Sequence, residues 1–256
     1  MEQTVVRIRT LEIGSGMPKI CVPVVGKTEK EILEGAERAK AAKPDLVEFR
    51  VDWYEEAADS KKVVALLEKL RKCLGELPVL FTFRSSREGG EAALSDGAYQ
   101  SLNEAAIASG FVDCVDVELF SGDAVVKAVV AAAHSNHVKV IASNHDFEKT
   151  PAAEELLARL QKMEALGADI PKIAVMPQSS KDVLTLLTVT ESWKETGKAP
   201  VITMSMAGEG LISRLCGEIF GSAVTFGAGK SSAPGQIDAE ELRRILEIIH
   251  QNSNRQ

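Results

Sequence analysis

The sequence predicts an α/β protein folded as a (β/α)8 barrel, the TIM-barrel architecture, and three observations support this fold class. Short apolar segments rich in β-formers recur eight times along the 256 residues. Segments with apolar residues at three- and four-residue spacing, typical of helices, lie between them. Polar residues occur at the ends of most of the apolar segments, where barrels of this class build their active sites. A doubly wound open sheet is the competing architecture, but it normally has fewer strands and gathers its ligand sites at one switch point.

The apolar, β-rich segments are the predicted barrel strands. They cover residues 19–25, 46–52, 78–84, 114–120, 138–145, 170–177, 200–206 and 223–227. Ahead of them, residues 4–14 alternate apolar and polar side chains with the two-residue period of a strand. We expect this segment to form a β-hairpin that closes the N-terminal mouth of the barrel.

Helix signals are clearest in three of the segments between and after the strands. These segments are residues 28–42, 150–167 and 238–251. In the second, Thr150 is the expected N-cap, Pro151 the first helical residue, and Gly167 follows the last turn. Asp238 is the expected cap of the final helix.

The chain has no Pro-, Gly- or Ser-rich linker and no low-complexity tract. We therefore expect residues 1–256 to form a single domain. Within it, residues 1–18 would be the hairpin extension and residues 19–251 the barrel.

Composition and net charge indicate which kinds of molecule the protein is expected to bind. A chain that is 45% hydrophobic and 26% charged has the make-up of an ordinary globular protein. Its net charge of -7 argues against nucleic acid and anionic membranes as partners, because both require a basic surface. The N-terminal segment has no continuous apolar run of the kind found in signal peptides or membrane spans, so a cytoplasmic location is the default expectation.

The sequence shows no motif for a metal or a cofactor. The four cysteines (Cys21, Cys73, Cys114 and Cys216) are scattered singly, without the paired spacing of a zinc site or a disulfide framework. There is no Walker-type phosphate loop, no GxGxxG after the first strand, and no His/Cys cluster at metal-binding spacing. We expect reduced cysteines, no metal site and no cofactor.

Ionisable and polar side chains recur on one face of several predicted strands. Residues two apart on a strand point to the same side, and charged groups would be very costly against the helices. They are therefore expected inside the barrel, toward the C-terminal strand ends. The side chains assigned to this inner face are Glu48, Arg50, Asp52, Thr82, Arg84, Asp116, Glu118, Ser143, His145 and Lys172.

Lys172 lies within an otherwise apolar strand segment, "DIPKIAVMP". A lysine at a strand end often extends into water. When Lys172 is considered by itself, this alternative stays open. Inside a barrel, beside Arg and His cations and partly desolvated, an amine is partly unprotonated and can attack a carbonyl to form an imine. His145 is then the inward-facing candidate base, and Glu88 could orient its imidazole.

Other residues are suited to an anionic, hydroxylated ligand. Arg214 follows the seventh strand, where its guanidinium could clamp a carboxylate. The segment "GAGKSSAPGQI" follows the eighth strand and offers Ser232 and Gln236 as hydrogen-bonding groups. It could close over the site as a lid, although a plain surface connector is the ordinary reading of such a loop.

Six motifs resemble those of the type I 3-dehydroquinate dehydratase family, the Schiff-base enzymes of the shikimate pathway. The likeness extends from the first strand to the last helix and keeps the family's motif order. The motifs are EFRVD (48–52), FTFRSSREGGE (81–91), SNHDFEKTP (143–151), PKIAVMP (171–177), TMSMAGEGLISRL (203–215) and SAPGQI (232–237).

The resemblance implies an activity and roles for the residues. Lys172 would form an imine with 3-dehydroquinate, His145 would move the protons of a syn elimination of water, and Glu88 would partner His145. It also implies a cytoplasmic homodimer that works without a cofactor in aromatic amino acid biosynthesis. The implied substrate-binding residues are Glu48, Arg50 and Arg84 for the ring hydroxyls and the site of imine formation; Arg214, Ser232 and Gln236 for the carboxylate; and Met204, Met206, Phe147 and Phe226 for the apolar flank.

Two other functions compete with this one. A class I aldolase or transaldolase also places an imine-forming lysine on the sixth strand, but many such substrates are phosphorylated and need a phosphate cradle after the last strands. A ligand sensor could keep the barrel and the carboxylate clamp without catalysis. The presence of both Lys172 and His145 disfavours the sensor.

Overall fold

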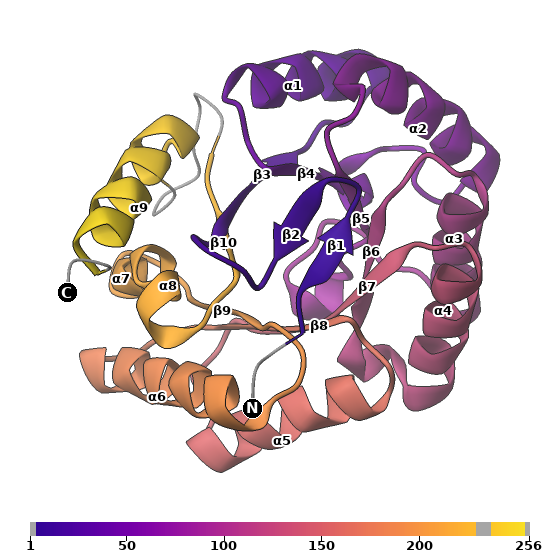
Figure 1. Ribbon diagram of the computed structural model, residues 1–256. Helices are drawn as coiled ribbons and strands as arrows, with labels where there is room; N and C mark the ends of the chain where they lie inside the picture. The colour runs from indigo at the N-terminus through magenta and orange to yellow at the C-terminus, as the bar shows by residue number, and fades with distance from the viewer. Residues whose placement is uncertain (1–3, 229–236, 254–256) are drawn as a thin grey trace.

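The computed structural model describes residues 4–228 and 237–253, which form a closed ring of eight parallel strands surrounded by helices (Figure 1). The sheet order is β10-β3-β4-β5-β6-β7-β8-β9. A parallel bridge between Val201 and Ser222 joins the two outer strands and closes the barrel, which excludes the open sheet. The strands are β3 (Lys19–Val24), β4 (Leu46–Arg50), β5 (Val79–Thr82), β6 (Cys114–Glu118), β7 (Lys139–Asp146), β8 (Ile170–Val175), β9 (Ile202–Ser205) and β10 (Val224–Phe226).

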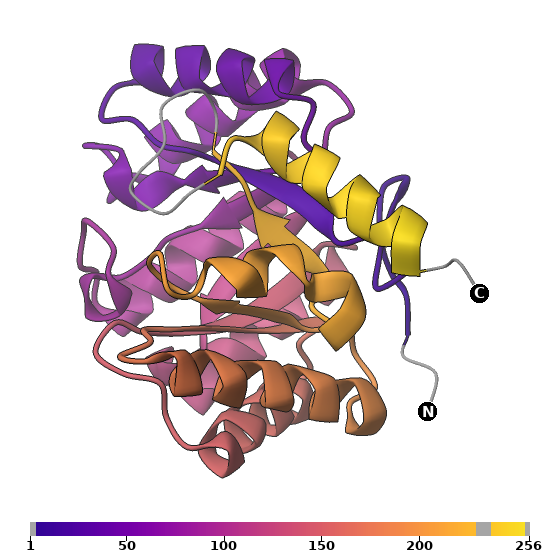
Figure 2. The ribbon, with the colours of Figure 1, turned by 90° about the vertical axis from the view of Figure 1, so that its left-hand side faces the viewer.

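Helices follow the strands and form the outer layer, as the side view shows (Figure 2). Side-chain caps begin two of them: Thr28 and Glu31 form a capping box at the start of the first helix, and Asp59 caps the second. The α-helices are α1 (Glu29–Ala41), α2 (Ser60–Leu74), α3 (Asp96–Ala108), α4 (Asp123–Ser135), α5 (Ala153–Ala165), α6 (Ser180–Thr196), α7 (Leu211–Leu215), α8 (Gly217–Phe220) and α9 (Ala239–Ser253). Short 3-10 turns are η1 (Val51–Trp53), η2 (Ser86–Glu88) and η3 (Leu119–Ser121).

The N-terminal segment forms the predicted hairpin. Strands β1 (Val6–Ile8) and β2 (Leu11–Ile13) pair antiparallel and lie across the centre of the barrel in Figure 1. Their buried apolar side chains pack with residues at the beginnings of barrel strands, such as Leu46 and Ile170. The hairpin therefore covers the N-terminal mouth, and only the opposite end of the barrel is left for a polar site.

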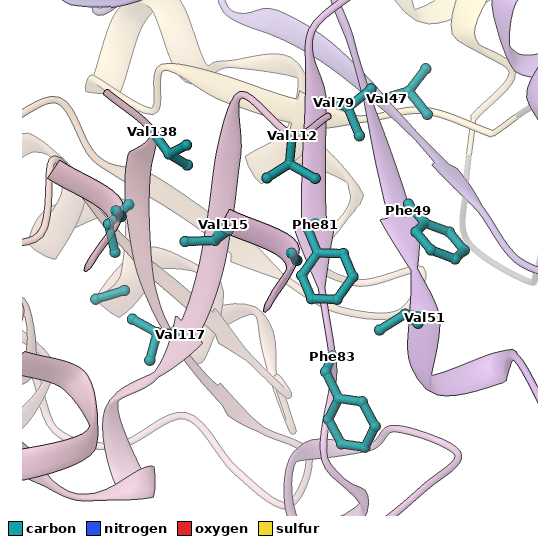
Figure 3. Close-up of a cluster of buried hydrophobic side chains, with 14 of the residues drawn as sticks. Val47, Phe49, Val51, Val79, Phe81, Phe83, Val112, Val115, Val117 and Val138 are labelled. Atoms are coloured by element: carbon teal, nitrogen blue, oxygen red, sulfur yellow. The ribbon is translucent and has the colours of Figure 1, made fainter. Parts of the chain in front are cut away.

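The main apolar core lies between the strands and the helices. Val47 and Phe49 of β4 point outward into it, and the ring of Phe49 meets Phe81 of β5 edge to face at a centroid distance of 6.2 Å (Figure 3). The residues between them in sequence, such as Glu48, point inward. Strand alternation thus separates the apolar packing surface from the polar interior.

Several predicted boundaries are corrected by the structure; β5, for example, ends at Thr82 and not at residue 84. Strand β4 ends at Arg50, and residues 51–53 form a 3-10 turn instead of extending the strand. Likewise β6 ends at Glu118 and is followed by a 3-10 turn. Thr150 is not a helix cap, because α5 begins at Ala153 and the Thr150 hydroxyl donates instead to the carbonyl of Met176.

Other predicted features are confirmed. Gly167 follows the last turn of α5 with a φ of 95°, a value that favours glycine. The Asp238 carboxylate accepts a hydrogen bond from the backbone N–H of Glu240 at the start of α9. All four cysteines are free thiols, as expected.

Candidate active site

A cavity of about 180 Å³ opens at the C-terminal ends of the strands. Every predicted site residue within the described part of the chain lines it, whereas Ser232, Gln236 and most of the proposed lid lie outside the described residues. The lining side chains come from nearly all the strands and from the loops that follow them. They are Pro23, Glu48, Arg50, Arg84, Glu88, Gly89, His145, Phe147, Lys172, Ala174, Met204, Met206, Arg214 and Phe226.

Lys172 points into this cavity and does not extend into water. Only 3% of the residue is exposed. Its Nζ lies 3.7 Å from Asp116 Oδ2, 3.9 Å from Glu48 Oε1 and 4.5 Å from the centre of the Phe226 ring. Carboxylates therefore stand nearest to the amine, whereas the sequence led us to expect mainly cations around it.

His145 is held by Glu88. Oε2 of Glu88 accepts the backbone N–H of His145 at 2.8 Å and lies 3.0 Å from His145 Nδ1. A carboxylate oxygen in this position places the ring hydrogen on Nδ1, so Nε2 keeps its lone pair. Burial, with Arg84 and Lys172 nearby, holds the pKa of His145 well below its usual value. The imidazole is thus a neutral base at neutral pH.

Glu88 belongs to η2, the turn after β5, and only 4% of it is exposed. Burial raises its pKa to about 7, although the Arg84 guanidinium opposes the rise. Its second oxygen accepts a hydrogen bond from the Asn144 side chain at 3.3 Å. A carboxyl group that titrates near neutrality therefore adjoins the candidate base.

Arg84 is buried close to Glu88, and both of its Nη atoms already donate hydrogen bonds. Nη1 donates to Glu118 at 2.9 Å and to the Ser143 hydroxyl at 3.0 Å, while Nη2 donates to Asp116 at 2.8 Å. Such a charge network is stable only because nearly every donor and acceptor is satisfied. Arg84 thus organises the carboxylates of the barrel interior in addition to lining the cavity.

Arg50 and Glu48 are also held in place. Arg50 makes a bidentate pair with Asp52, with both donor–acceptor distances 2.8 Å. Glu48 Oε1 accepts the Thr82 hydroxyl at 2.9 Å. Asp52 was expected at the end of a strand, but its side chain reaches Arg50 from the 3-10 turn.

Arg214 differs from the other two arginines of the cavity. It lies on α7, and its Nε is buried without a hydrogen-bond partner among residues 4–228 and 237–253. Burial lowers the pKa of this guanidinium from its usual value. A desolvated guanidinium with an unused donor is suited to binding an anion.

The apolar flank contains a constraint that the sequence reasoning missed. Gly89 has a φ of 78°, and a Cβ built there would lie 2.4 Å from the ring of Phe147. The aromatic ring can lie against the backbone only because position 89 has no side chain. The Gly-Gly pair after Glu88 was the signal that could have pointed to this contact.

No group of three or more His, Cys, Asp or Glu side chains in residues 4–228 and 237–253 is arranged to hold a metal ion. Within the same residues, no helix is long and apolar enough to cross a membrane.

Comparison with known proteins identifies the family of the chain. The family model described as type I 3-dehydroquinase matches residues 20–253. A 3-dehydroquinate dehydratase of Listeria innocua is 56% identical over 244 residues, covering 95% of this chain and 97% of that protein. The Bacillus subtilis 3-dehydroquinate dehydratase is 54% identical over 251 residues, covering 97% and 98%.

Solved structures show the same relationship. The type I 3-dehydroquinate dehydratase of Clostridium difficile, described with covalently modified comenic acid, superposes with a TM-score of 0.96 at 52% identity, over 98% of this chain and 99% of that one. The 3-dehydroquinate dehydratase of Geobacillus kaustophilus gives a TM-score of 0.94 at 42% identity, over 98% of both chains. On the family match and these relatives, the chain belongs to the type I 3-dehydroquinase family.

Proposed function

We propose that this chain is a hydro-lyase that removes water from 3-dehydroquinate to give 3-dehydroshikimate through an imine on Lys172. The observation that carries the proposal is the buried Lys172 amine sharing one cavity with the paired His145 and Glu88. The names of the closely similar relatives supply the substrate. An aldolase acting on a phosphorylated sugar finds less support, because Arg214 suits a carboxylate and relatives of more than 50% identity are dehydratases.

Imine formation is the first step. Nζ of the neutral Lys172 amine adds to the ketone carbon, a proton moves from nitrogen to oxygen, and loss of water after a further protonation leaves a C=N bond with a positive charge at nitrogen. This iminium draws electron density from the adjacent carbon. The hydrogen on that carbon becomes acidic enough for a side-chain base to remove.

The elimination follows. Nε2 of His145 takes the proton from the adjacent carbon, and the electrons of the broken C–H bond form an enamine with the lysine nitrogen. The enamine electrons then expel the tertiary hydroxyl group, which takes the proton back from His145 and leaves as water. Hydrolysis of the new iminium releases the ketone product and restores the Lys172 amine. Glu88 keeps the imidazole in the tautomer that these steps require.

Substrate recognition is assigned to the remaining residues. Arg214, whose Nε has no partner among the described residues, would bind the carboxylate, with Ser232 and Gln236 proposed on the resemblance of their motif alone. Glu48 and Arg50 would contact the ring hydroxyls, and Arg84 would fix the floor beneath the imine. Met204, Met206, Phe147 and Phe226 would contact the apolar parts of the ring.

The wider biological setting also remains a proposal. On family membership we assign the chain to the shikimate pathway of aromatic amino acid biosynthesis, in the cytoplasm, as a homodimer that uses no cofactor. We further propose that residues 1–256 act as one domain, with residues 1–18 as the hairpin extension and residues 19–251 as the barrel. Neither nucleic acid nor a membrane is expected as a partner, given the net charge of -7.

Borohydride trapping tests the function directly. The protein is incubated with 3-dehydroquinate and borohydride, and its intact mass and peptide map are measured. We expect a stable adduct on Lys172, none on a folded Lys172→Ala variant, and an unchanged adduct on Lys181→Ala, which alters an exposed lysine. Turnover by Lys172→Ala, or trapping of the unaltered protein at another residue, would disprove the imine mechanism.

A further inference from the structure

Asp116 lies on β6 and is fully buried next to Lys172. Its two oxygens have different surroundings. Oδ1 accepts hydrogen bonds from Arg84 at 2.8 Å and from the Ser143 hydroxyl at 2.7 Å. Oδ2 is buried and has no hydrogen-bond partner in the part of the chain that the structure describes.

The unpartnered oxygen faces the reactive lysine. Its distance to Lys172 Nζ is 3.7 Å, which is close enough for an ion pair but too long for a hydrogen bond. A buried acceptor without a donor is costly, so native proteins seldom keep one unless it has a use. The position of Oδ2 points to a use at the lysine nitrogen.

Asp116 is a carboxylate at neutral pH. Burial alone would raise its pKa, but Arg84 and Lys172 act more strongly together, and the pKa lies below its usual value. Arg84 is also paired with Glu118, so Asp116 does not receive the whole charge of the guanidinium. A negative charge is therefore available to Lys172 throughout the physiological range.

Glu48 is the only other described carboxylate paired with the Lys172 amine, and it is less suited to this role. The Glu48 oxygen nearest to Nζ, at 3.9 Å, already accepts the hydroxyl hydrogen of Thr82. Glu48 also lines the cavity, where the substrate is expected to bind. Asp116 is fully buried, does not line the cavity, and has Oδ2 3.7 Å from the lysine nitrogen.

We propose that Asp116 Oδ2 is the counter-charge that keeps the imine on Lys172 protonated during the reaction. The inference rests on the proposed function, because it concerns the intermediate of that reaction. When the amine becomes an iminium, Nζ keeps a single hydrogen and a positive charge, and Oδ2 is the acceptor free to receive that hydrogen. Asp116 exchanges no atoms with the substrate. It stabilises the charge that makes the iminium an electron sink.

The variant Asp116→Asn isolates this charge. Its amide oxygen can still accept hydrogen bonds from Arg84 and Ser143, while an uncharged amide replaces the oxygen that faces Lys172. The test measures the rate of trapping by cyanoborohydride, which reduces iminium ions in preference to ketones, from pH 5 to pH 9. We expect the upper pH limit for trapping to fall by about 1–3 pH units and kcat to fall about 10²–10³-fold.

Two matched variants separate the charge from other effects. Ser143→Ala removes one hydrogen bond from Oδ1 but leaves the carboxylate charged, so the upper pH limit for trapping should not move. Glu48→Gln removes the neighbouring negative charge, whose nearest oxygen is 3.9 Å from Nζ and already accepts the Thr82 hydroxyl, so it should raise KM and lower that limit by less than Asp116→Asn does. Circular dichroism and thermal unfolding establish that each variant is folded before trapping is measured.

The outcomes are distinguishable. If folded Asp116→Asn lowers kcat but traps with the pH profile of the unaltered protein, Asp116 only anchors Arg84 and the inference is wrong. If the variant does not fold, the unaltered protein decides: trapping that is constant to above pH 8 supports a counter-charge, and loss of trapping near pH 7 overturns it. Failure of the unaltered protein to form any adduct on Lys172 would instead disprove the proposed function.

Discussion

At the scale of single residues, the buried charges of the cavity are arranged around Arg84. Its guanidinium contacts Asp116 and Glu118 directly and lies 3.7 Å from Glu88. Three carboxylates so close together would repel one another without this cation. Because His145 is also close enough for Arg84 to lower its pKa, one side chain supports both the lysine side and the histidine side of the site.

The raised pKa of Glu88 predicts a pH-dependent stability difference. A carboxyl group with a folded-state pKa of about 7 adds stability below its unfolded pKa near 4.5, and this contribution is lost as the pH rises through 7. Glu88→Gln has no titrating carboxyl group at this position. Relative to the variant, the unaltered protein should therefore lose about 2–3 kcal/mol of unfolding free energy between pH 4.5 and pH 8.

Urea unfolding of both proteins at pH 5 and pH 8 measures this difference. The same variant should lose activity, because an amide cannot hold the imidazole tautomer as a carboxylate does. Glu91→Gln, at an exposed position in the same loop, is the matched control and should show no such pH-dependent difference. Equal pH dependence in Glu88→Gln and the unaltered protein would show that Glu88 is ionised normally.

Substitution of Arg214 is predicted to weaken substrate binding. Arg214→Ala removes the guanidinium and should raise KM about 10- to 100-fold, the range for one charged hydrogen-bonding group. Arg214→Lys keeps the positive charge but loses the two-pronged hydrogen-bonding geometry of the guanidinium. Its KM should lie between those of the unaltered protein and Arg214→Ala. Steady-state kinetics with 3-dehydroquinate measures both, and an unchanged KM in Arg214→Ala would place the carboxylate elsewhere.

At the scale of elements, the alternation of side chains along parallel strands was sufficient to predict most of the site. Strand β7 shows both the success and the limit. Ser143 and His145 point inward as expected, but Asn144, assigned to neither face, contacts Glu88 from the turn after β5. Contacts between a strand and the loop of another strand depend on how the loop folds back, which residue periodicity does not encode.

Tertiary contacts that residue periodicity does not encode also explain two other differences between the predictions and the structure. Which acid Arg84 would bind depends on the register of β5 against β6, where Thr82 stands opposite Asp116. A pattern read along one strand cannot give that register. The Thr150 cap failed for a similar reason, since the hydroxyl found a tertiary partner in the carbonyl of Met176.

The turn after β5 gives an element-scale prediction. Gly89→Ala should be destabilised by about 1 kcal/mol for the left-handed backbone, and its methyl group should also displace the Phe147 ring from the cavity mouth and raise KM. Gly75→Ala is the matched control, because Gly75 has a φ of 64° but nothing lies within 4 Å of its added Cβ. It should lose similar stability with normal KM. If both variants have normal KM, Phe147 does not contribute to substrate binding.

In the barrel taken as a whole, the residues that stabilise the fold and the residues of the candidate site lie toward opposite ends of the barrel axis. The hairpin β1–β2 closes one end with apolar side chains, while the polar cavity occupies the other. The interior changes accordingly from Leu46, Cys114 and Ile170 near the hairpin to charged residues further along the same strands. Such a division is expected of barrels in which the C-terminal face carries the catalytic residues.

Ile13→Ala tests this division. Ile13 is fully buried between the hairpin and the barrel, so truncation should reduce the unfolding free energy by about 2–5 kcal/mol through lost burial and the cavity left behind. Val5→Ala, at an exposed position of the same segment, should change it by less than about 0.5 kcal/mol. Both variants should keep kcat and KM per folded molecule, because the change lies at the opposite end of the barrel from Lys172. A change in kcat of folded Ile13→Ala, measured well below its melting temperature, would mean that the hairpin influences the catalytic strand ends through the interior.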